Sequence, residues 1–248
     1  SDNHARLYEI SGGLLESSSH KCAVLAALIH NDGKRMITAS ADKTVVMRTS
    51  AFVRSLRHDA AVNQAIFNAQ GTLLISGSAD KTVKIWNAST GQVVKSIPTG
   101  AAVNGVGINS AGTLVVSIGA DKSLQIWSSA ATKPGAAIAP ITKVTLDNLP
   151  SSIAFSGDGK RIAVGETSGK TGRACVYDAS TGVKLSQVAS FTAPVSTLTF
   201  HTDNLTLLSA SEDRTVRLDK VNGLNAIKAH EGGVVDVQFD NTGNRVLT

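Results

Sequence analysis

The sequence predicts an all-β protein assembled from repeated four-stranded antiparallel units. Three observations support this prediction. A segment of about forty residues recurs along the 248-residue chain, each copy holds short apolar runs, and glycine is frequent at 22 residues whereas aromatic residues make up 4%. Short apolar runs bounded by Gly, Asn, Asp and Ser are typical of strands joined by tight turns.

The repeat is clearest in residues 73–92, which read LLISGSADKTVKIWNASTGQ. Altered copies stand at residues 36–50, 114–133 and 207–223. The four copies align on one aspartate each, and these are Asp42, Asp80, Asp121 and Asp213. They lie 38, 41 and 92 residues apart, so the long last interval predicts one further, more altered copy.

That altered copy contains RIAVGETSGKTGRACVYDASTGVKL, residues 161–185. Aligning its VYDASTG with IWNASTG of the clear copy sets Tyr177 on Trp86 and leaves three extra residues in GETSGKTGR. We therefore expect a lengthened, flexible turn between two strands. The letters GKT also occur in phosphate-binding loops, but those need two glycines separated by four residues and a helix after the lysine. Here three residues separate Gly165 from Gly169 and a strand pattern follows, so no nucleotide site is predicted.

Each copy holds four short apolar runs, which in the clearest case are VNQAIF, TLLISGS, TVKIWN and VVKSI. The turns between them read AQG, ADK and STG. A unit of four antiparallel strands is too small to bury both of its faces alone, and stacking on its neighbours stabilises it. The sequence therefore predicts a β-propeller of four-stranded antiparallel blades.

Five complete blades are predicted, at about residues 20–57, 58–98, 99–145, 146–190 and 191–229. The chain start aligns with the last two strands of a blade, with Asp2 on Asp80 and Tyr8 on Trp86. The chain end aligns with the first two, with His230 on His58 and Thr248 on Ser76. Residues 230–248 with 1–19 are thus expected to form a sixth blade, and residues 1–248 a single domain. The alternative is a portion of a propeller with seven or more blades.

Residues 58–87, HDAAVNQAIFNAQGTLLISGSADKTVKIWN, resemble one unit of the WD-repeat family, and a weaker resemblance extends over essentially the whole chain. In that family a structural tetrad of hydrogen-bonded His, Ser or Thr, Asp and Trp side chains supports the blade. By position, the resemblance implies His58, Ser76, Asp80 and Trp86 for this tetrad. The chemistry is consistent, because a buried carboxylate needs several hydrogen-bond donors.

The other copies retain only part of the tetrad. The first keeps His20, Thr38 and Asp42 but has Arg48 at the Trp position. The third keeps Ser117, Asp121 and Trp127 and has Thr99 in place of His. The copy with Asp213 keeps Ser209, has Phe191 in place of His, and is expected to have lost its Trp by a one-residue deletion in LDKVNG. The altered copy keeps only Tyr177, so we expect several blades to rely more on packing than on polar bonds.

A set of cations stands beside the repeated aspartate, and this set defines a candidate partner-binding face: Lys43, Lys81, Lys122 and Arg214, with Lys170 and Arg173 in the altered copy. Equivalent turns of a propeller emerge on one side, so these side chains are predicted to form a basic ring there. The simpler interpretation is that they are ordinary solvated residues that partly offset the neighbouring aspartates. The alternative is that the ring binds an anion or an acidic partner. The formal charge is +5, but basic residues are spread along the chain, which does not favour specific nucleic-acid binding.

No catalytic residue, metal site or cofactor is predicted. The chain has no GxSxG motif, and Cys22 and Cys175 lack the spacing of a metal or redox pair. No apolar run reaches 18 residues, so no membrane span is expected. A cytoplasmic location is the default expectation, and the first residue need not be the native N-terminus.

The resemblance implies a non-catalytic interaction scaffold that binds a protein or peptide partner on one face of the propeller. The alternative is the propeller domain of a larger multidomain enzyme or electron-transfer protein. Oligomeric state and partner identity are not indicated by the sequence.

Overall fold

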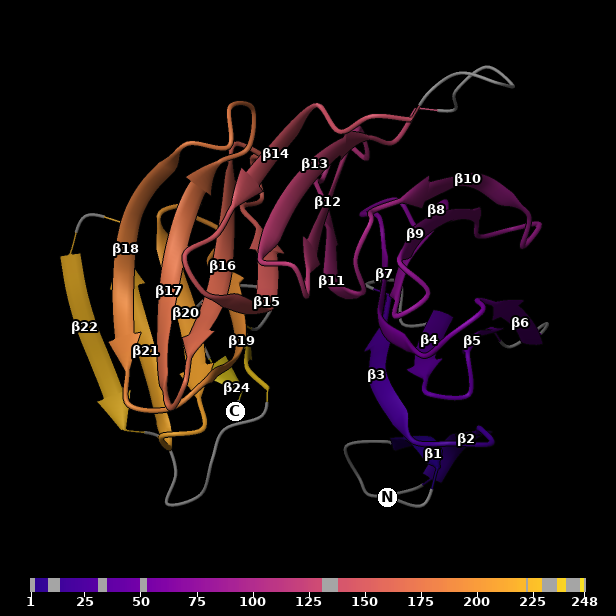
Figure 1. The fold of residues 1–248 in the computed structure, drawn as a ribbon. Coiled ribbons are helices and arrows are strands. Elements are labelled where there is room, and N and C mark those ends of the chain that lie inside the picture. The colour runs from indigo at the N-terminus through magenta and orange to yellow at the C-terminus, as the bar shows by residue number, and fades with distance from the viewer. Residues whose placement is uncertain are drawn as a thin grey trace. The chain divides into compact units, whose positions relative to one another are not determined.

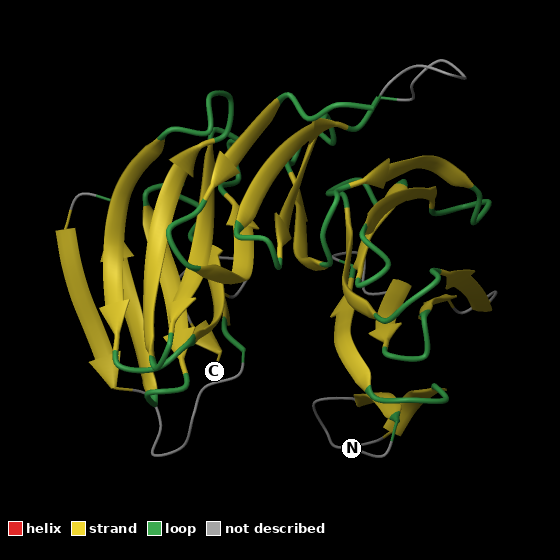
Figure 2. Cartoon of the chain, viewed as in Figure 1, coloured by secondary structure: helices red, strands yellow, loops and turns green. Residues whose placement is uncertain are grey.

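The computed structural model of the chain consists of strands joined by turns (Figure 1). It describes residues 3–8, 14–30, 35–49, 53–130, 138–221, 223–228, 236–239 and 246–247. Figure 2 shows that these residues contain strands and loops and no helix. The predicted all-β class is therefore confirmed. Within the described ranges there is also no helix able to span a membrane.

Most described residues belong to five four-stranded antiparallel sheets, in each of which the strands follow sequence order from one edge to the other. The first sheet contains β3 (Val24–Ile29), β4 (Arg35–Ser40), β5 (Thr44–Thr49) and β6 (Val53–Arg57). The second contains β7 (Val62–Phe67), β8 (Leu73–Ser78), β9 (Thr82–Asn87) and β10 (Val93–Pro98). The third contains β11 (Val103–Ile108), β12 (Leu114–Gly119), β13 (Ser123–Ser128) and β14 (Thr142–Thr145). The fourth contains β15 (Leu149–Phe155), β16 (Arg161–Ser168), β17 (Thr171–Asp178) and β18 (Lys184–Phe191). The fifth contains β19 (Val195–Phe200), β20 (Thr206–Ser211), β21 (Thr215–Lys220) and β22 (Gly223–Lys228).

Near the chain ends the described residues form two two-stranded sheets. One pairs β1 (His4–Tyr8) with β2 (Leu14–Ser19), and the other pairs β23 (Gln238–Phe239) with β24 (Val246–Leu247). Asp2, His230 and Thr248, on which the predicted split blade was aligned, lie outside the described residues, as does the side chain of Tyr8. The six-bladed ring and the single-domain boundaries stay predictions.

The chain divides into two compact units. The first holds residues 1–106 with 131–138, and the second holds residues 107–130 with 139–248. The first and second sheets belong to the first unit, and the fourth and fifth sheets to the second. Most of the third sheet also belongs to the second unit.

Sheet stacking buries both faces of the second strand in each four-stranded sheet. β4, β8, β12, β16 and β20 each have at least five consecutive buried residues. The outermost strand β10 instead alternates between exposed and buried positions. In the first unit, one core cluster joins Ile37 and Met47 of the first sheet to Leu74 and Trp86 of the second. This pattern explains why the central strands are nearly continuous apolar runs.

Within each unit, the turns between the first and second strands of neighbouring sheets lie on the same side. In the second unit, the Ser110 hydroxyl donates to the Gly157 carbonyl at 2.6 Å, and the Asp158 amide donates to the Asn204 side chain at 3.0 Å. All four residues lie in turns between the first and second strands of a sheet. In the first unit, the guanidinium of Arg35, at the start of β4, donates to the Gly71 carbonyl in the β7–β8 turn. Because these turns share one side, the hairpins between second and third strands emerge on the opposite side of each unit.

The fourth sheet corrects the prediction of a lengthened flexible turn in GETSGKTGR. Here β16 and β17 have eight residues each, and only Gly169 and Lys170 lie between them. The strand pairing extends through Glu166 with Arg173 and Ser168 with Thr171. The additional residues therefore lengthen the ladder, because each added pair makes strand contacts that a loop would lack. Since β17 begins at Thr171, no helix follows the GKT segment.

The fifth sheet corrects the predicted one-residue deletion at the Trp position. Asp219 pairs with Leu207 in the same register in which Trp86 pairs with Leu74 in the second sheet. The strand is intact, and aspartate replaces tryptophan within it. The turn between β21 and β22 is shorter than the turn between β9 and β10. The missing residue therefore belongs to this turn and not to the strand.

Gly172 gives a test of how closely the fourth and fifth sheets pack. A Cβ atom on Gly172 would lie 2.4 Å from the Ala193 carbonyl oxygen and 2.9 Å from the Val195 amide nitrogen. Since both neighbours are backbone, we expect Gly172→Ala to lower the free energy of unfolding by about 2 kcal/mol, measured by urea denaturation. Lys170→Ala, two residues away and exposed, serves as the control and should change it by less than about 0.5 kcal/mol. Equal stability of the two variants would contradict the packing.

Candidate functional site

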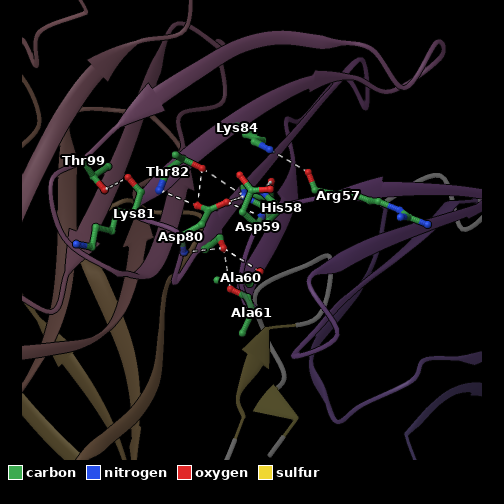
Figure 3. Close-up of polar contacts among 12 residues, drawn as sticks. Arg57, His58, Asp59, Ala60, Ala61, Asp80, Lys81, Thr82, Lys84 and Thr99 are labelled. Carbon is green, nitrogen blue, oxygen red and sulfur yellow. Dashed lines mark hydrogen bonds and ion pairs between the residues drawn. The ribbon is translucent and has the colours of Figure 1, made fainter.

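Four side chains of the second sheet form one continuous hydrogen-bonded chain. His58 precedes β7, Ser76 lies on β8, Asp80 lies in the β8–β9 hairpin, and Trp86 lies on β9. His58 Nδ1 is 2.8 Å from Asp80 Oδ2, His58 Nε2 is 2.7 Å from Ser76 Oγ, and Trp86 Nε1 donates to Ser76 Oγ at 2.8 Å. Figure 3 shows the His58 and Asp80 end of this chain. All four residues assigned to the tetrad by position thus lie together.

Asp80 receives hydrogen bonds from several sides. Besides His58, the Asp59 amide donates to Oδ2 at 3.0 Å, and the Thr82 amide and hydroxyl donate to Oδ1 at 2.9 and 2.6 Å. Burial opposes ionisation of this carboxyl, but the hydrogen bonds from Thr82, Asp59 and His58 outweigh it, and the pKa of Asp80 is lowered. The carboxylate therefore stays ionised at neutral pH.

The protonation of His58 follows from its surroundings. Its side chain is fully buried, and burial lowers its pKa from the usual 6.5 even though Asp80 acts in the opposite direction. A neutral imidazole carries one proton, and the ionised Asp80 requires that proton on Nδ1. Nε2 then accepts from the Ser76 hydroxyl, whose oxygen accepts from the Trp86 indole. Every donor among the His58, Ser76 and Trp86 side chains therefore has an acceptor.

The other sheets assemble parts of the same arrangement. In the first sheet, His20 Nε2 is 2.7 Å from Thr38 Oγ1 and Nδ1 is 3.1 Å from Asp42 Oδ2. Arg48 pairs with Met36 in the register of Trp86 with Leu74, so it stands at the Trp position.

In the third sheet, the Trp127 indole donates to Ser117 Oγ at 3.0 Å, and Asp121 accepts from Ser123. Thr99, at the His position, donates its hydroxyl to the Lys81 and Ala101 carbonyls, at 2.8 Å in each case.

The fifth sheet has no aromatic residue at the Trp position. Asp213 Oδ2 accepts from the Thr192 amide at 3.0 Å, and Oδ1 accepts from the Thr215 amide at 3.0 Å. Ser209, which stands at the position of Ser76, is buried, and its hydroxyl makes no hydrogen bond to any residue that the structure describes. Phe191 instead packs in an apolar cluster with Leu198 and Leu207.

The hairpin cations share one unusual backbone conformation. Lys43, Lys81, Lys122 and Arg214 have φ angles of 74°, 68°, 61° and 72°. In each hairpin the preceding aspartate accepts the amide of the residue after the cation, at 3.0, 2.9, 3.2 and 3.0 Å. This Asx-type bond across the turn tightens it and leaves the cation in the left-handed region, which is sparsely populated outside glycine and asparagine.

The cation's carbonyl is also held in place. Lys43 O accepts from the His58 amide at 2.9 Å, and Lys81 O accepts from the Thr99 amide at 2.9 Å. In the second unit, Lys122 O accepts from the Leu146 amide at 2.7 Å. The side chains of these lysines are exposed at the hairpin tips. Backbone bonds to the residue that directly follows the fourth strand of the same sheet therefore determine where each charge is presented.

A model of the family described as "WD domain, G-beta repeat" matches four segments of the chain, residues 13–47, 50–87, 91–128 and 185–218, which together exceed half of its length. The chain belongs to the WD-repeat family. A search of curated proteins finds no match to the chain. WD repeats generally mediate protein–protein interactions, and their propellers are typically non-catalytic.

The matched WD repeats leave out most of the fourth sheet, and there a different polar network replaces the tetrad. Glu166 on β16 is fully buried and stands directly opposite Arg173 on β17. Tyr177 donates its hydroxyl to Glu166 Oε1 at 2.8 Å. Arg173 donates from Nη2 and Nε to Oε2 at 2.9 and 3.2 Å, and the backbone amide of Asn148 donates to Oε2 at 3.2 Å. A strand residue therefore supplies the carboxylate that the turn aspartate supplies in other WD repeats.

Sequence reasoning missed Glu166 because it was assigned to a loop. The available signal was a Glu and an Arg placed symmetrically about Gly169 and Lys170, which are opposed if the strands continue to that turn. Arg173 belongs to this network, and its Nη2 also donates to Asp147 Oδ2 at 2.7 Å. Its side chain remains 23% exposed. Lys170, in contrast, is exposed at the hairpin tip.

In the part of the chain that the structure describes, the cysteines and histidines of this WD-repeat protein belong to no metal-binding cluster. No group of three His, Cys, Asp or Glu side chains gathers there. Burial, together with nearby Glu166, raises the pKa of Cys175 to about 11, so this thiol stays protonated and unreactive. The same two causes raise the pKa of Tyr177.

The lowered pKa of His58 predicts acid sensitivity. As the pH falls below 6.5, the unfolded imidazole takes up a proton that the folded one does not, so the free energy of unfolding should decrease. The lowered pKa of Asp80 adds a second decrease as the pH falls below 3.8. Urea denaturation between about pH 5 and 8 measures the first decrease.

His58→Gln serves as the control for this pH dependence. It should lower the free energy of unfolding by about 1 to 2 kcal/mol near neutral pH, because it disrupts bonds to Ser76 and Asp80. It should also flatten the dependence around pH 6. An unchanged slope in this variant would assign the acid sensitivity to other groups.

Glu166→Gln tests the network of the fourth sheet. The amide is similar in shape but leaves the Arg173 charge without its buried partner. We expect the free energy of unfolding to fall by about 2 kcal/mol, less than for a fully buried pair because Arg173 is partly exposed and keeps Asp147. Glu212→Gln, an exposed glutamate in the next hairpin, should change it by less than about 0.5 kcal/mol. Thermal or urea unfolding that fails to separate the two variants would overturn the assignment.

Proposed function

We propose that this protein is a non-catalytic scaffold that binds acidic segments of a protein partner through a hairpin face on each of its two units. The hairpin face of a unit is defined by the tips of its hairpins between second and third strands: Lys43 and Lys81 in the first unit, and Lys122, Lys170 and Arg214 in the second. The observation that carries the proposal is the repeated left-handed cation beside an aspartate whose carboxylate is used internally.

The charge pattern of the hairpins supports this proposal. Asp42 and Asp80 direct their carboxylates to a histidine, to backbone amides and to threonine, and their side chains are only 8% and 6% exposed. Lys43 and Lys81 are exposed beside them, and within the described residues neither forms an ion pair. Each of these tips therefore presents positive charge outward although its formal charges cancel. A partner segment with several carboxylates gains from the several tips of one unit at once.

The backbone conformation of the tips also favours a binding role over ordinary solvated lysines. A lysine with a left-handed backbone has a higher conformational free energy than glycine or asparagine at the same place. The internal hydrogen bonds of the turn do not need the lysine side chain. The four hairpins nevertheless carry Lys, Lys, Lys and Arg there. Long cations at this position extend the reach of the face toward a partner.

Asparagine substitutions test the proposal without disturbing the backbone, because asparagine tolerates the left-handed region. The variant combines Lys43→Asn, Lys81→Asn, Lys122→Asn and Arg214→Asn. A fluorescently labelled peptide library rich in Glu and Asp should bind the native protein in a salt-dependent way, and the variant should bind about tenfold or more weakly. Fluorescence anisotropy at two salt concentrations measures both.

The matched control is Lys160→Asn, an exposed lysine in the β15–β16 turn on the opposite side of the second unit. It should bind the library like the native protein. Salt-independent binding, or equal affinity of the fourfold variant and the control, would refute the acidic-partner proposal.

A further inference from the structure

A hollow of about 560 Å³ lies in the first unit beside the third and fourth strands of the first sheet. Its wall is formed by β5, β6, the end of β2 and the residues that follow β2 and β6. Thr44, Val46 and Arg48 alternate along β5, and Arg57 and Ser55 stand opposite Thr44 and Val46 on β6. These five side chains therefore share one face of the sheet and line the hollow together. Its volume falls in the range typical of ligand pockets.

The second sheet shows why the hollow is open in the first. At the positions of Val46 and Arg48 the second sheet has Lys84 and Trp86. Lys84 Nζ donates to the Arg57 carbonyl at 2.9 Å and lies 5.6 Å from the centre of the Trp86 ring, so a stacked pair fills that face. The first sheet has no aromatic ring at this place. Figure 3 shows the Lys84 bond and the Arg57 side chain extending away from the His58 and Asp80 cluster.

The wall of the hollow is strongly cationic. Four cations line it: Lys21, Lys43, Arg48 and Arg57. Asp42 is the carboxylate among the lining residues, and its two oxygens already accept from His20, the Lys21 amide and Thr44. Burial opposes its ionisation, but those hydrogen bonds outweigh it and lower the pKa of Asp42, so it offers neither a proton nor a free oxygen. The lining thus carries an excess of positive charge.

A hydroxyl without a partner is a second, independent sign of a ligand. Ser18 lines the hollow and is 1% exposed, and its Oγ makes no hydrogen bond to any described residue. A buried hydroxyl left without a partner costs free energy, so a ligand that accepts from it would recover this loss. Ser19, Thr44 and Ser55 add further hydroxyls to the same lining. Cations and hydroxyls that approach from several strands suit an anion with several acceptor oxygens.

We propose that this hollow binds a phosphoryl group carried by a serine or threonine of the partner protein. A phosphoryl dianion has three acceptor oxygens and nearly two negative charges, which matches ammonium, guanidinium and hydroxyl donors better than one planar carboxylate does. β6 is the outer strand of its sheet, so a partner segment can approach along that edge. The inference rests on the proposed function only in taking the ligand from a protein partner.

Lys21→Gln and Arg57→Gln test the hollow separately from the hairpin face, because neither residue belongs to that face. Both side chains are exposed, so the variants should fold. The probes are a phosphoserine peptide library, the same library without phosphate, and inorganic phosphate. Native protein should bind the phosphorylated library at least about tenfold more tightly than either other probe, and each variant should lose about tenfold in that affinity. Titration calorimetry or fluorescence anisotropy measures these affinities.

Lys220→Gln, an exposed lysine at the end of β21, is the matched control and should bind all three probes like the native protein. Equal affinity for the phosphorylated and unphosphorylated libraries would overturn the phosphoryl site, as would binding that survives in both variants. Inorganic phosphate binding as tightly as the phosphopeptides would overturn the assignment to a partner protein. If acidic peptides still require the hairpin lysines while these tests fail, the proposed function stands and the phosphoryl site alone is refuted.

Discussion

The requirement to satisfy one carboxylate in each repeat governs much of this structure. In the second sheet Asp80 accepts from an imidazole, two backbone amides and a hydroxyl. These donors come from His58 and Asp59, which follow β6, and from Thr82 at the start of β9. The carboxylate, which itself lies in the hairpin, therefore links three segments. Its ionised state depends on all of them, since burial alone would favour the neutral acid.

The same requirement shapes the surface. An aspartate that turns inward across a tight hairpin leaves the next residue in the left-handed region, with its side chain directed outward at the tip. Lys43 and Lys81 then present charge that their neighbouring aspartates do not neutralise locally. Structural support and the candidate binding face are therefore two consequences of one hairpin geometry.

Departures from the repeat are as informative as the repeat itself. The fourth sheet moves its carboxylate from the turn into the strand, where Glu166 bonds to Arg173 and Tyr177, and two longer strands accompany this change. The first sheet lacks the tryptophan, and a cationic hollow lies beside Arg48 in its place. Each loss of the standard arrangement thus produces a local feature with its own chemistry.

The sequence by itself determined the all-β class and the four-stranded units, because strand periodicity and repeat alignment depend only on local pattern. The tetrad residues of the second sheet were implied by the resemblance to WD repeats. It did not determine how far β16 and β17 extend, since a polar hairpin and a polar loop have the same composition. Nor did it indicate that Glu166 is buried or that Lys21 and Arg57 line one hollow. Burial and convergence depend on how sheets stack, and residues distant in sequence acquire a shared environment only when the tertiary structure forms.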